Sequence, residues 1–368
     1  MEMDEQNVMI APSRTISSEY MHWAKTHGDV LYNLANSGVP DYPLNEIPFS
    51  NEDLVLTGAG SYGSQPLLQT IASRYNVPVD SVVTTLGASM ANFLVMALTL
   101  QPGDEVLIEH PTYELLLSAA RFLGASVKRF HRKFEEGFQV NINELEQTIT
   151  PKTRLIVLTN LHNPSSAFTD EIRMKQIGEA ARSVGARIMV GEIYLPTMFD
   201  RKPFSALDFG NEFITTNSLT KTYGLSGLRL GWILAEPDIA QKLWRLIDLF
   251  YANHVTLSDK LGLCAFQHIE AMTLRSKTML DANRLVFNKF LKEHNEIECS
   301  KSEYGTIVFP RLKKGNVERF IENLRTNHQT LVTPGSFFEM PDHFRMGLGV
   351  KPEIFSAGLE RIGLALKS

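Results

Sequence analysis

The chain has 368 residues, of which 43% are hydrophobic and 21% are charged, and its formal net charge at pH 7 is −5. These values are those of an ordinary globular protein that is long enough for two domains. The negative charge and the lack of a Lys/Arg run argue against a nucleic-acid partner. The longest apolar runs, such as FLVMALTL, are too short to span a bilayer, so no membrane association is expected.

Cysteine usage and the first residues bear on the cellular compartment. The only cysteines, Cys264 and Cys299, lie in no metal-binding or redox spacing, which fits a reducing environment. The opening segment, MEMDEQNVMI, is acidic and lacks the apolar core with a basic flank that is typical of a signal peptide. We therefore expect a cytoplasmic enzyme or binding protein.

The N-terminal segment predicts a helix over SEYMHWAKTHG, followed by an extended arm, LYNLANSGVP. From residue 80 onward, short β-rich runs alternate with stretches of helical spacing. The β-rich runs are SVVTTLG, EVLIEHP, SVKRF, TRLIVLTN, ARIMVGEIY, FITTNS and LRLGWILAE. This alternation predicts right-handed βαβ units and a mainly parallel sheet that helices cover on both faces.

A long helical stretch from about Pro237 to near Met272 predicts a connector. Beyond it the order becomes helix, strands, helix, strands and a closing helix, EIFSAGLERIGLALK. The sequence thus predicts an α/β protein: a large domain with a mainly parallel sheet flanked by helices, plus a small α+β domain. We expect the N-terminal arm, which joins the small domain, at 1–50, the large domain at 51–255 and the small C-terminal domain at 256–368.

Three local patterns suggest chemistries that the rest of the chain does not support. GAGSYG at 58–63 satisfies the dinucleotide-binding pattern G-x-G-x-x-G, but Asp80, roughly 20 residues on, precedes a strand instead of ending one. Ser218 and Lys221 form S-x-x-K, but the companion motifs S-D-N and K-T-G of the serine β-lactamases are missing. No H-E-x-x-H motif or close Cys/His cluster supports a metal site.

Loops at the predicted strand ends carry groups that suit a phosphorylated ligand. The Gly-Ala-Ser segment at 87–89 lies between a strand and a helix start, where free N–H groups favour a phosphate, although a glycine turn with a serine cap also explains it. The stretch SLTKTYGLSGLRLGW at 218–232 places a hydroxyl, an amine and a guanidinium on glycine-rich backbone. Arg229 offers phosphate oxygens a fixed fork, which leaves Lys221 free for another role.

The order of LGASMAN, HPTY, NLHNPSS, EIY, SLTKTYGLSGLRLGW and FRMGLG resembles that of the fold-type-I pyridoxal-phosphate enzymes, class I/II aminotransferases in particular. The resemblance extends from about residue 30 to the C-terminus. The lysine segment is its most specific part and matches S-x-x-K-x-x-G-x-x-G-x-R-x-G, whereas NLHNPSS resembles N-P-H-N-P-T-G with three substitutions. The resemblance implies an aminotransferase that moves an amino group from an α-amino acid to a 2-oxo acid, with pyridoxal 5'-phosphate as cofactor.

The resemblance also implies a role for each matching residue. Lys221 would form a Schiff base with the cofactor aldehyde and then move a proton, and the positive charge of Arg229 would favour its neutral amine. Arg345 would receive the substrate α-carboxylate, with Gly38 as backbone beside it. The implied phosphate ligands are Gly87, Ala88, Ser89, Ser218 and Arg229. The implied ring contacts are Tyr113, which stacks on the ring, and Asn163 and Tyr194, which bind its 3' oxygen.

One position departs from the family pattern. Where the family has D-E-x-Y this chain has VGEIY, so Gly191 replaces the Asp that pairs with the protonated ring nitrogen. Losing one charge-assisted hydrogen bond costs ~1.5–3 kcal/mol, which is ~10- to 100-fold or more in rate if all of it appears in the transition state. Compensation by Glu192 is one explanation, but side chains alternate along a strand, so Glu192 should face away unless a bulge shifts the register.

The substitution at 191 leaves two alternatives to transamination open: a pyridoxal-phosphate lyase or racemase, and a cofactor-binding protein with weak catalysis. The resemblance further implies a homodimer with sites at the interface, in which Tyr62 is a weak match for a Tyr that reaches the partner's cofactor phosphate. The sequence identifies no particular substrate, since no second Arg stands out for a distal carboxylate. Tyr20, Trp23 and Tyr32 suit a substrate pocket and a core equally well.

Overall fold

A computed structural model describes residues 15–367 except positions 55 and 59. The opening segment MEMDEQNVMI, in which we expected no signal peptide, and Ala59 of GAGSYG therefore lie outside the described residues. The largest element is a seven-stranded sheet of order β2-β8-β7-β6-β5-β3-β4. Its strands are β2 (Val82–Leu86), β3 (Glu105–His110), β4 (Ser126–His131), β5 (Thr153–Thr159), β6 (Arg187–Gly191), β7 (Phe213–Ser218) and β8 (Leu230–Leu234).

The sheet is mainly parallel, as predicted. Only β8 runs against its neighbours, pairing antiparallel with both β2 and β7, whereas the pairs from β7 through β4 are parallel. β-Branched and aliphatic residues dominate the central strands, and most of their side chains are buried, as expected for a sheet that is covered on both faces.

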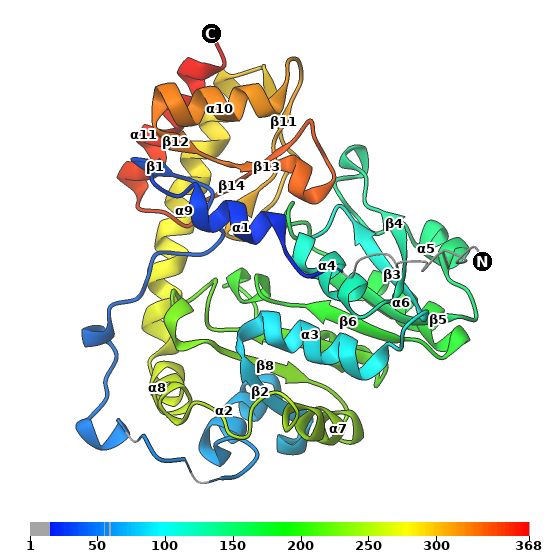
Figure 1. The fold of residues 1–368 in the computed structure, drawn as a ribbon. Helices are drawn as coiled ribbons and strands as arrows, with labels where there is room; N and C mark the ends of the chain where they lie inside the picture. Colours follow the sequence, from blue (N-terminus) through cyan, green and yellow to red (C-terminus); the bar gives the residue numbers. More distant parts are fainter. Residues whose placement is uncertain (1–14, 55, 59, 368) are drawn as a thin grey trace, which may run out of the picture.

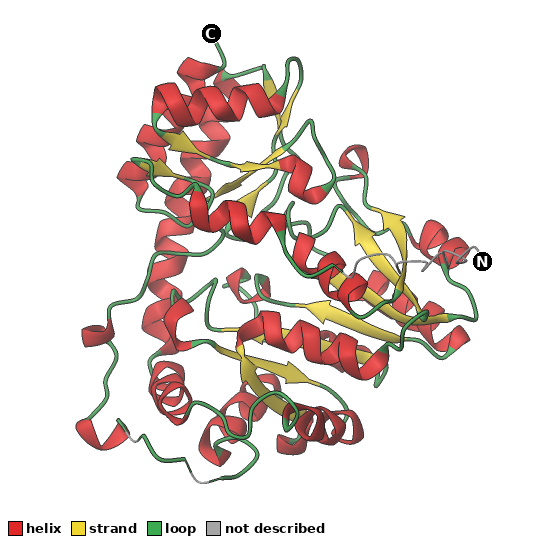
Figure 2. Cartoon of the chain, in the orientation of Figure 1, coloured by secondary structure: helices red, strands yellow, loops and turns green. Residues whose placement is uncertain are grey.

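Helices cover the two faces of this sheet (Figures 1 and 2). They are α2 (Gln65–Tyr75), α3 (Gly87–Thr99), α4 (Glu114–Phe122), α5 (Ile142–Thr148), α6 (Glu171–Val184) and α7 (Pro237–Ile247). Met189 packs in the core that contains residues of α3, whereas its strand neighbours Ile188 and Val190 pack in the core that contains residues of α6. Alternation along β6 therefore places Gly191 on the α3 face of the sheet.

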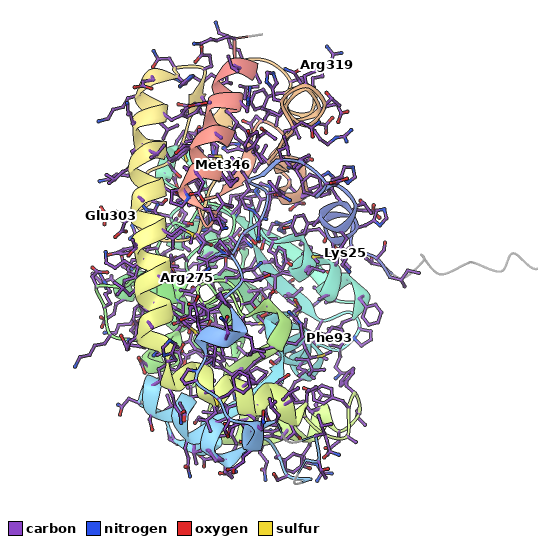
Figure 3. All side chains as sticks on the ribbon, turned by 90° about the vertical axis from the view of Figure 1, so that its left-hand side faces the viewer. Lys25, Phe93, Arg275, Glu303, Arg319 and Met346 are labelled. Atoms are coloured by element: carbon purple, nitrogen blue, oxygen red, sulfur yellow. The ribbon has the colours of Figure 1, made fainter. Side chains whose placement is uncertain are left out.

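The C-terminal part of the chain combines helices with short strands. Its helices are α8 (Thr256–Gln267), α9 (Ile269–Glu293), α10 (Val317–His328) and α11 (Pro352–Ala365). Its strands are β9 (Ile297–Glu298), β10 (Ile307–Val308), β11 (Arg311–Leu312), β12 (Thr330–Leu331), β13 (Thr333–Pro334) and β14 (Phe344–Gly347). Figure 3 shows α9 running along one side of the molecule, from the sheet to the helices of this part.

The N-terminal segment is built into both parts. Helix α1 (Glu19–Thr26), capped by the Ser18 hydroxyl, lies between the sheet and the C-terminal part (Figure 1). Strand β1 (Tyr32–Asn33) pairs parallel with β12, and Leu34 is fully buried in the core that α9, α10 and α11 share. These contacts agree with the expected arm, while boundaries at residues 50 and 255 stay a prediction.

The predicted connector is not one helix, and this part of the prediction is wrong. Helix α7 ends at Ile247 and α8 begins at Thr256, whereas α9 extends well past Met272 to Glu293. The intervening loop contains Leu249 and Phe250, whose apolar side chains continue the helical pattern in the sequence although they are exposed. Within the described residues, no helix combines the length and apolarity that a membrane span requires.

The buried position of Leu34 yields a stability prediction. Leu34→Ala should lower the free energy of unfolding by about 2–5 kcal/mol, because it leaves a cavity where the arm enters the C-terminal core. The matched control is Leu31→Ala, whose side chain is 70% exposed and should matter little. Urea unfolding of the two variants measures the difference, and equal midpoints would contradict this account of the arm.

Candidate active site

Polar side chains gather at the edge where the parallel strands of the sheet end. Tyr113 follows β3, Asn163 follows β5, Tyr194 follows β6 and Lys221 follows β7. Because the carboxyl ends of parallel strands share one edge, these loops come together there. Arg229 reaches the same edge from the other direction, since it directly precedes the antiparallel strand β8.

The amine of Lys221 is the centre of this group. Its Nζ donates a hydrogen bond to the Ser37 Oγ at 2.9 Å. Removal from water lowers the pKa of Lys221 from its ordinary 10.5 to about 8, with help from the positive charges of Arg345 and then Arg229. At pH 7 about a tenth of such an amine is neutral, which a nucleophile or base requires.

Ser37 ties the amine to the C-terminal part of the chain. While its hydroxyl accepts from Lys221, its backbone carbonyl accepts a hydrogen bond from the Thr306 Oγ1 at 2.7 Å. The same hydroxyl also contacts Tyr194, and this contact partly offsets the burial that raises the pKa of the Tyr194 phenol. The sequence offered no signal for Ser37, because these partners are remote along the chain.

Arg345 is a buried guanidinium within electrostatic reach of Lys221. One Nη donates to the Asn163 Oδ1 at 3.2 Å and the other to the Tyr20 hydroxyl at 2.7 Å. Its Nε, by contrast, is buried without a hydrogen-bond partner. A buried donor left unpaired is unfavourable, so the site is suited to an anion that engages this side of the fork.

The first turn of α3 forms a cradle for a second anion. Gly87 has φ +79°, and a Cβ there would lie 2.5 Å from an Nη of Arg229. Gly231 is equally bare, since its Cβ would lie 2.6 Å from the Gly87 carbonyl carbon. No side chain caps this helix, so its leading N–H groups, up to Ser89, are available to a phosphate beside the Arg229 guanidinium.

The remaining predicted site residues lie around the amine and the cradle. Ser218 is buried at the end of β7, and its hydroxyl accepts from the Thr220 N–H at 3.3 Å. Tyr113 is the N-cap residue of α4 and packs edge-on against Tyr20, with ring centroids 5.7 Å apart. Gly38 lies against the lysine segment, because a Cβ there would be 3.3 Å from the Lys221 carbonyl oxygen.

The structure shows how much space surrounds Gly191 and which way Glu192 faces. A Cβ at this glycine would lie 3.1 Å from the methyl carbon of Thr159. Glu192 faces away, as alternation predicts: its Oε1 accepts from the Ala206 N–H at 2.7 Å on the opposite face of the sheet. Burial raises the pKa of Glu192 to about 8, so this carboxyl is largely protonated at neutral pH.

Tyr20 and Tyr62, two aromatic residues considered from the sequence, differ in their position relative to the candidate site. Tyr20, which suited pocket and core equally, contacts both Arg345 and Tyr113 and so covers the candidate site. Tyr62 does not join the cluster: its hydroxyl donates to the Asp248 Oδ2 at 3.0 Å, and its ring lies against Trp244. A role for Tyr62 in a partner subunit's site stays a prediction.

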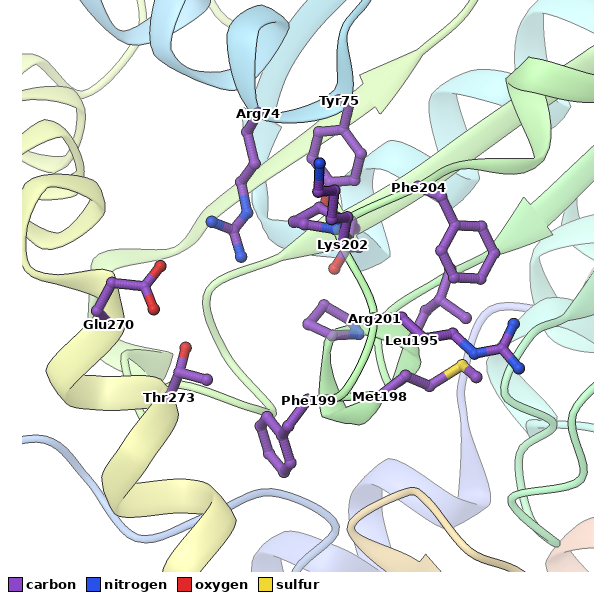
Figure 4. A pocket seen from close by; sticks show the side chains of 13 residues that line it. Arg74, Tyr75, Leu195, Met198, Phe199, Arg201, Lys202, Phe204, Glu270 and Thr273 are labelled. Carbon is purple, nitrogen blue, oxygen red and sulfur yellow. Dashed lines mark hydrogen bonds between the residues drawn. The ribbon is translucent and has the colours of Figure 1, made fainter.

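A separate cavity is lined by side chains from α2, α9, β7 and the loop after β6 (Figure 4). Arg74 from α2 and Glu270 from α9 both line it, together with Asn217 of β7. Asn217 directly precedes Ser218, and successive side chains of a strand point to opposite faces of the sheet. The cavity therefore lies on the opposite side of the sheet from the α3 cradle and is distinct from the candidate site.

The fold and these side chains define a class of protein that comparison with known proteins identifies. Residues 52–362 match the family model described as aminotransferase class I and II. Because this match spans most of the chain, the chain belongs to the class I and II aminotransferase family.

Individual relatives are similar over nearly the whole chain. An aspartate aminotransferase of Sulfolobus acidocaldarius is 29% identical, covering 88% of this chain and 87% of that protein. A capreomycidine synthase of Streptomyces vinaceus is 27% identical, covering 88% and 86%. A solved pyridoxal-phosphate-dependent aminotransferase of Streptococcus suis superposes with a TM-score of 0.89 at 26% identity and covers 98% of both chains.

These findings establish the activity class. The protein is an enzyme, a pyridoxal-phosphate-dependent aminotransferase, with the fold-type-I architecture expected from the sequence and pyridoxal 5'-phosphate as its cofactor. They do not favour the lyase, racemase or weakly catalytic alternatives. The glycine cradle at α3 and the unpartnered Nε of Arg345 fit the phosphate of this cofactor and the carboxylate of an amino acid, respectively.

The pKa of Lys221 yields a pH prediction. The rate at which the cofactor-free protein forms a visible absorption band with pyridoxal phosphate should rise with pH and level off above about 8, because only the neutral amine reacts. Arg345→Gln should move the midpoint upward by removing a positive charge. Lys221→Arg is the control and should give no band. A wild-type midpoint near 10.5 would contradict the prediction.

Proposed function

We propose that the cluster around Lys221 is the catalytic site of the aminotransferase. Lys221 holds the aldehyde end of the cofactor, and Arg345 receives the α-carboxylate beside the backbone of Gly38. The phosphate ligands are Gly87, Ala88, Ser89, Ser218 and Arg229. The contacts to the ring are Tyr113 on its face, and Asn163 and Tyr194 at its 3' oxygen.

One observation carries this proposal: an amine with a lowered pKa lies within electrostatic reach of a buried guanidinium whose Nε has no hydrogen-bond partner. The amine belongs to the loop after β7 and the guanidinium to β14, so the fold brings them together from remote parts of the sequence. An anionic substrate group at Arg345 would thus lie beside a base at Lys221.

The chain's own groups then divide the work. Pyridoxal phosphate, when bound, supplies the carbon that takes the amino group and a ring that delocalises electrons from the substrate. Arg345 orients the amino acid by a two-pronged contact through its unpartnered Nε and one of the two Nη groups that contact Asn163 and Tyr20. The neutral Nζ of Lys221 takes the proton from the substrate α-carbon and would deliver it to the cofactor carbon that takes the amino group.

The proposal also covers the domain division, the oligomeric state and the cellular location of the protein. We retain the division into an arm at 1–50, a large domain at 51–255 and a small domain at 256–368. A homodimer is supported by the exposed apolar residues of one loop, Leu249, Phe250 and Val255. Two unpaired thiols support a cytoplasmic location. Sedimentation at micromolar concentration tests the dimer, and cell fractionation tests the location.

The first experiment is an absorbance scan of the protein loaded with pyridoxal phosphate, before and after a panel of α-amino acids is added. Aspartate belongs in this panel, since some relatives are named for it. At least one donor should convert the visible band to the pyridoxamine form, and a 2-oxo acid should restore it. Lys221→Ala should abolish the response. A wild-type band that answers no donor would contradict the proposed site.

The glycine at 191 yields a rate prediction. Gly191→Asp should raise the transamination rate roughly 10-fold or more, because a carboxylate there would stabilise the protonated ring nitrogen. Thr159→Ser is combined with it to remove the methyl that would crowd the new Cβ.

Matched controls are Thr159→Ser alone and Gly191→Ala, which adds the Cβ without the charge. An unchanged or lower rate in the double variant, measured in single turnovers with a saturating donor, would rule out a rate limitation by the missing acid.

A further inference from the structure

The described residues place no free carboxylate on the α3 face of the sheet beside Gly191. Glu192 faces the opposite side. Glu109 is also buried, but both of its oxygens are engaged: Oε1 accepts from the backbone N–H and the hydroxyl of Thr159, and Oε2 accepts from Arg132. A pyridine nitrogen bound beside Gly191 would therefore find no free carboxylate among these groups to hold its proton.

The strand neighbours of Gly191 cannot donate to this nitrogen either. Thr159 and Thr216 are its register partners on β5 and β7. The Thr159 hydroxyl donates to Glu109 at 2.6 Å and accepts from the Asn163 N–H at 2.9 Å. The Thr216 hydroxyl donates to the Asn92 Oδ1 at 2.7 Å. Both hydroxyl protons are thus committed.

Asn92 is a further polar group near Gly191, because its side chain contacts Thr216, the register partner of Gly191. It lies on α3 one turn beyond Ser89, in the helix whose first turn forms the phosphate cradle. Its Oδ1 is occupied by Thr216, which leaves the amide N–H groups, and no hydrogen bond to a described residue uses them. Asn92 also lines a cavity together with Ser89 and Tyr113, two of the residues proposed to hold the cofactor.

We propose that Asn92 donates a hydrogen bond to the pyridine nitrogen in place of the missing carboxylate, so that this nitrogen stays unprotonated at neutral pH. The inference rests on the proposed function, since it presupposes the cofactor at this site. An amide N–H is a neutral donor and needs a lone pair as acceptor, which only the unprotonated nitrogen offers. Thr216 acts as a positioning residue because it fixes the amide of Asn92.

This arrangement has a chemical consequence. A neutral pyridine withdraws electrons less strongly than a pyridinium, so removal of the α-proton relies more on the base, Lys221. The expected penalty is roughly 10- to 100-fold in the rate of proton removal, the value of one charge-assisted hydrogen bond. The hydrogen bond from Asn92 orients the ring without supplying the charge.

The test uses the full-length protein loaded with pyridoxal phosphate that carries ¹⁵N in the ring. The ¹⁵N chemical shift distinguishes pyridine from pyridinium. We expect the wild type to show a hydrogen-bonded neutral nitrogen near pH 7. Asn92→Ala should move the signal to that of a nitrogen without a hydrogen bond. Asn92→Asp, which preserves shape and the Thr216 contact, should move it to the pyridinium position and raise the single-turnover rate.

Thr216→Val and Thr215→Val form a matched pair of near-isosteric changes at adjacent buried positions. Thr216→Val releases Asn92 and should broaden or shift the signal. Thr215 points to the opposite face, where its hydroxyl contacts Ser205, and Thr215→Val should leave the shift unchanged. This pair gives a readout if Asn92→Ala fails to fold.

Each outcome decides between the two proposals. A pyridinium signal in the wild type, or a neutral signal that the Asn92 and Thr216 variants leave unchanged, would overturn this inference while the proposed function stands. Absence of a cofactor band that depends on Lys221 would overturn the proposed function, and this inference with it. A neutral signal that moves as described supports both.

Discussion

The amine of Lys221 lies within electrostatic reach of two guanidinium groups, and the rest of the candidate site depends on this constraint. Burial and the charges of Arg345 and Arg229 together lower the pKa of Lys221 to about 8. The Arg345 Nε has no hydrogen-bond partner, and an Nη of Arg229 donates to the Leu86 carbonyl beside the α3 cradle, so both guanidinium groups offer positive charge to anionic ligands. One electrostatic arrangement thus favours the neutral form of the amine and suits the binding of anions beside it.

The sequence predicted the sheet well because each strand has a local sequence pattern that identifies it. Runs such as TRLIVLTN and ARIMVGEIY are short, apolar and bounded by polar turns, and they became β5 and β6. The connector failed for a different reason. Leu249 and Phe250 continue the apolar pattern of α7, but whether an apolar residue is covered depends on surfaces that are distant in sequence. Periodicity shows which side chains favour burial, but it does not show whether the fold provides a core that buries them.

The same distinction applies within the site. The orientation of Glu192 followed from strand alternation, which involves only adjacent residues. Ser37, Tyr20 and Asn92 could not be found in this way, because their partners lie 184, 325 and 124 positions away. Motifs identified most residues of the candidate site, whereas the contacts of Ser37 and Asn92 emerged only in the folded chain. Likewise, Gly191 shows that the carboxylate of the family pattern is missing, but the motif does not show which residue takes its place.

Ser37 gives this architecture a mechanical property. Its hydroxyl contacts the Lys221 amine in the loop after β7, and its carbonyl is held by Thr306 just before β10. A displacement of the C-terminal part relative to the sheet would pull on both contacts through one residue. The proton affinity of the amine would then change with the distance between the two halves of the molecule.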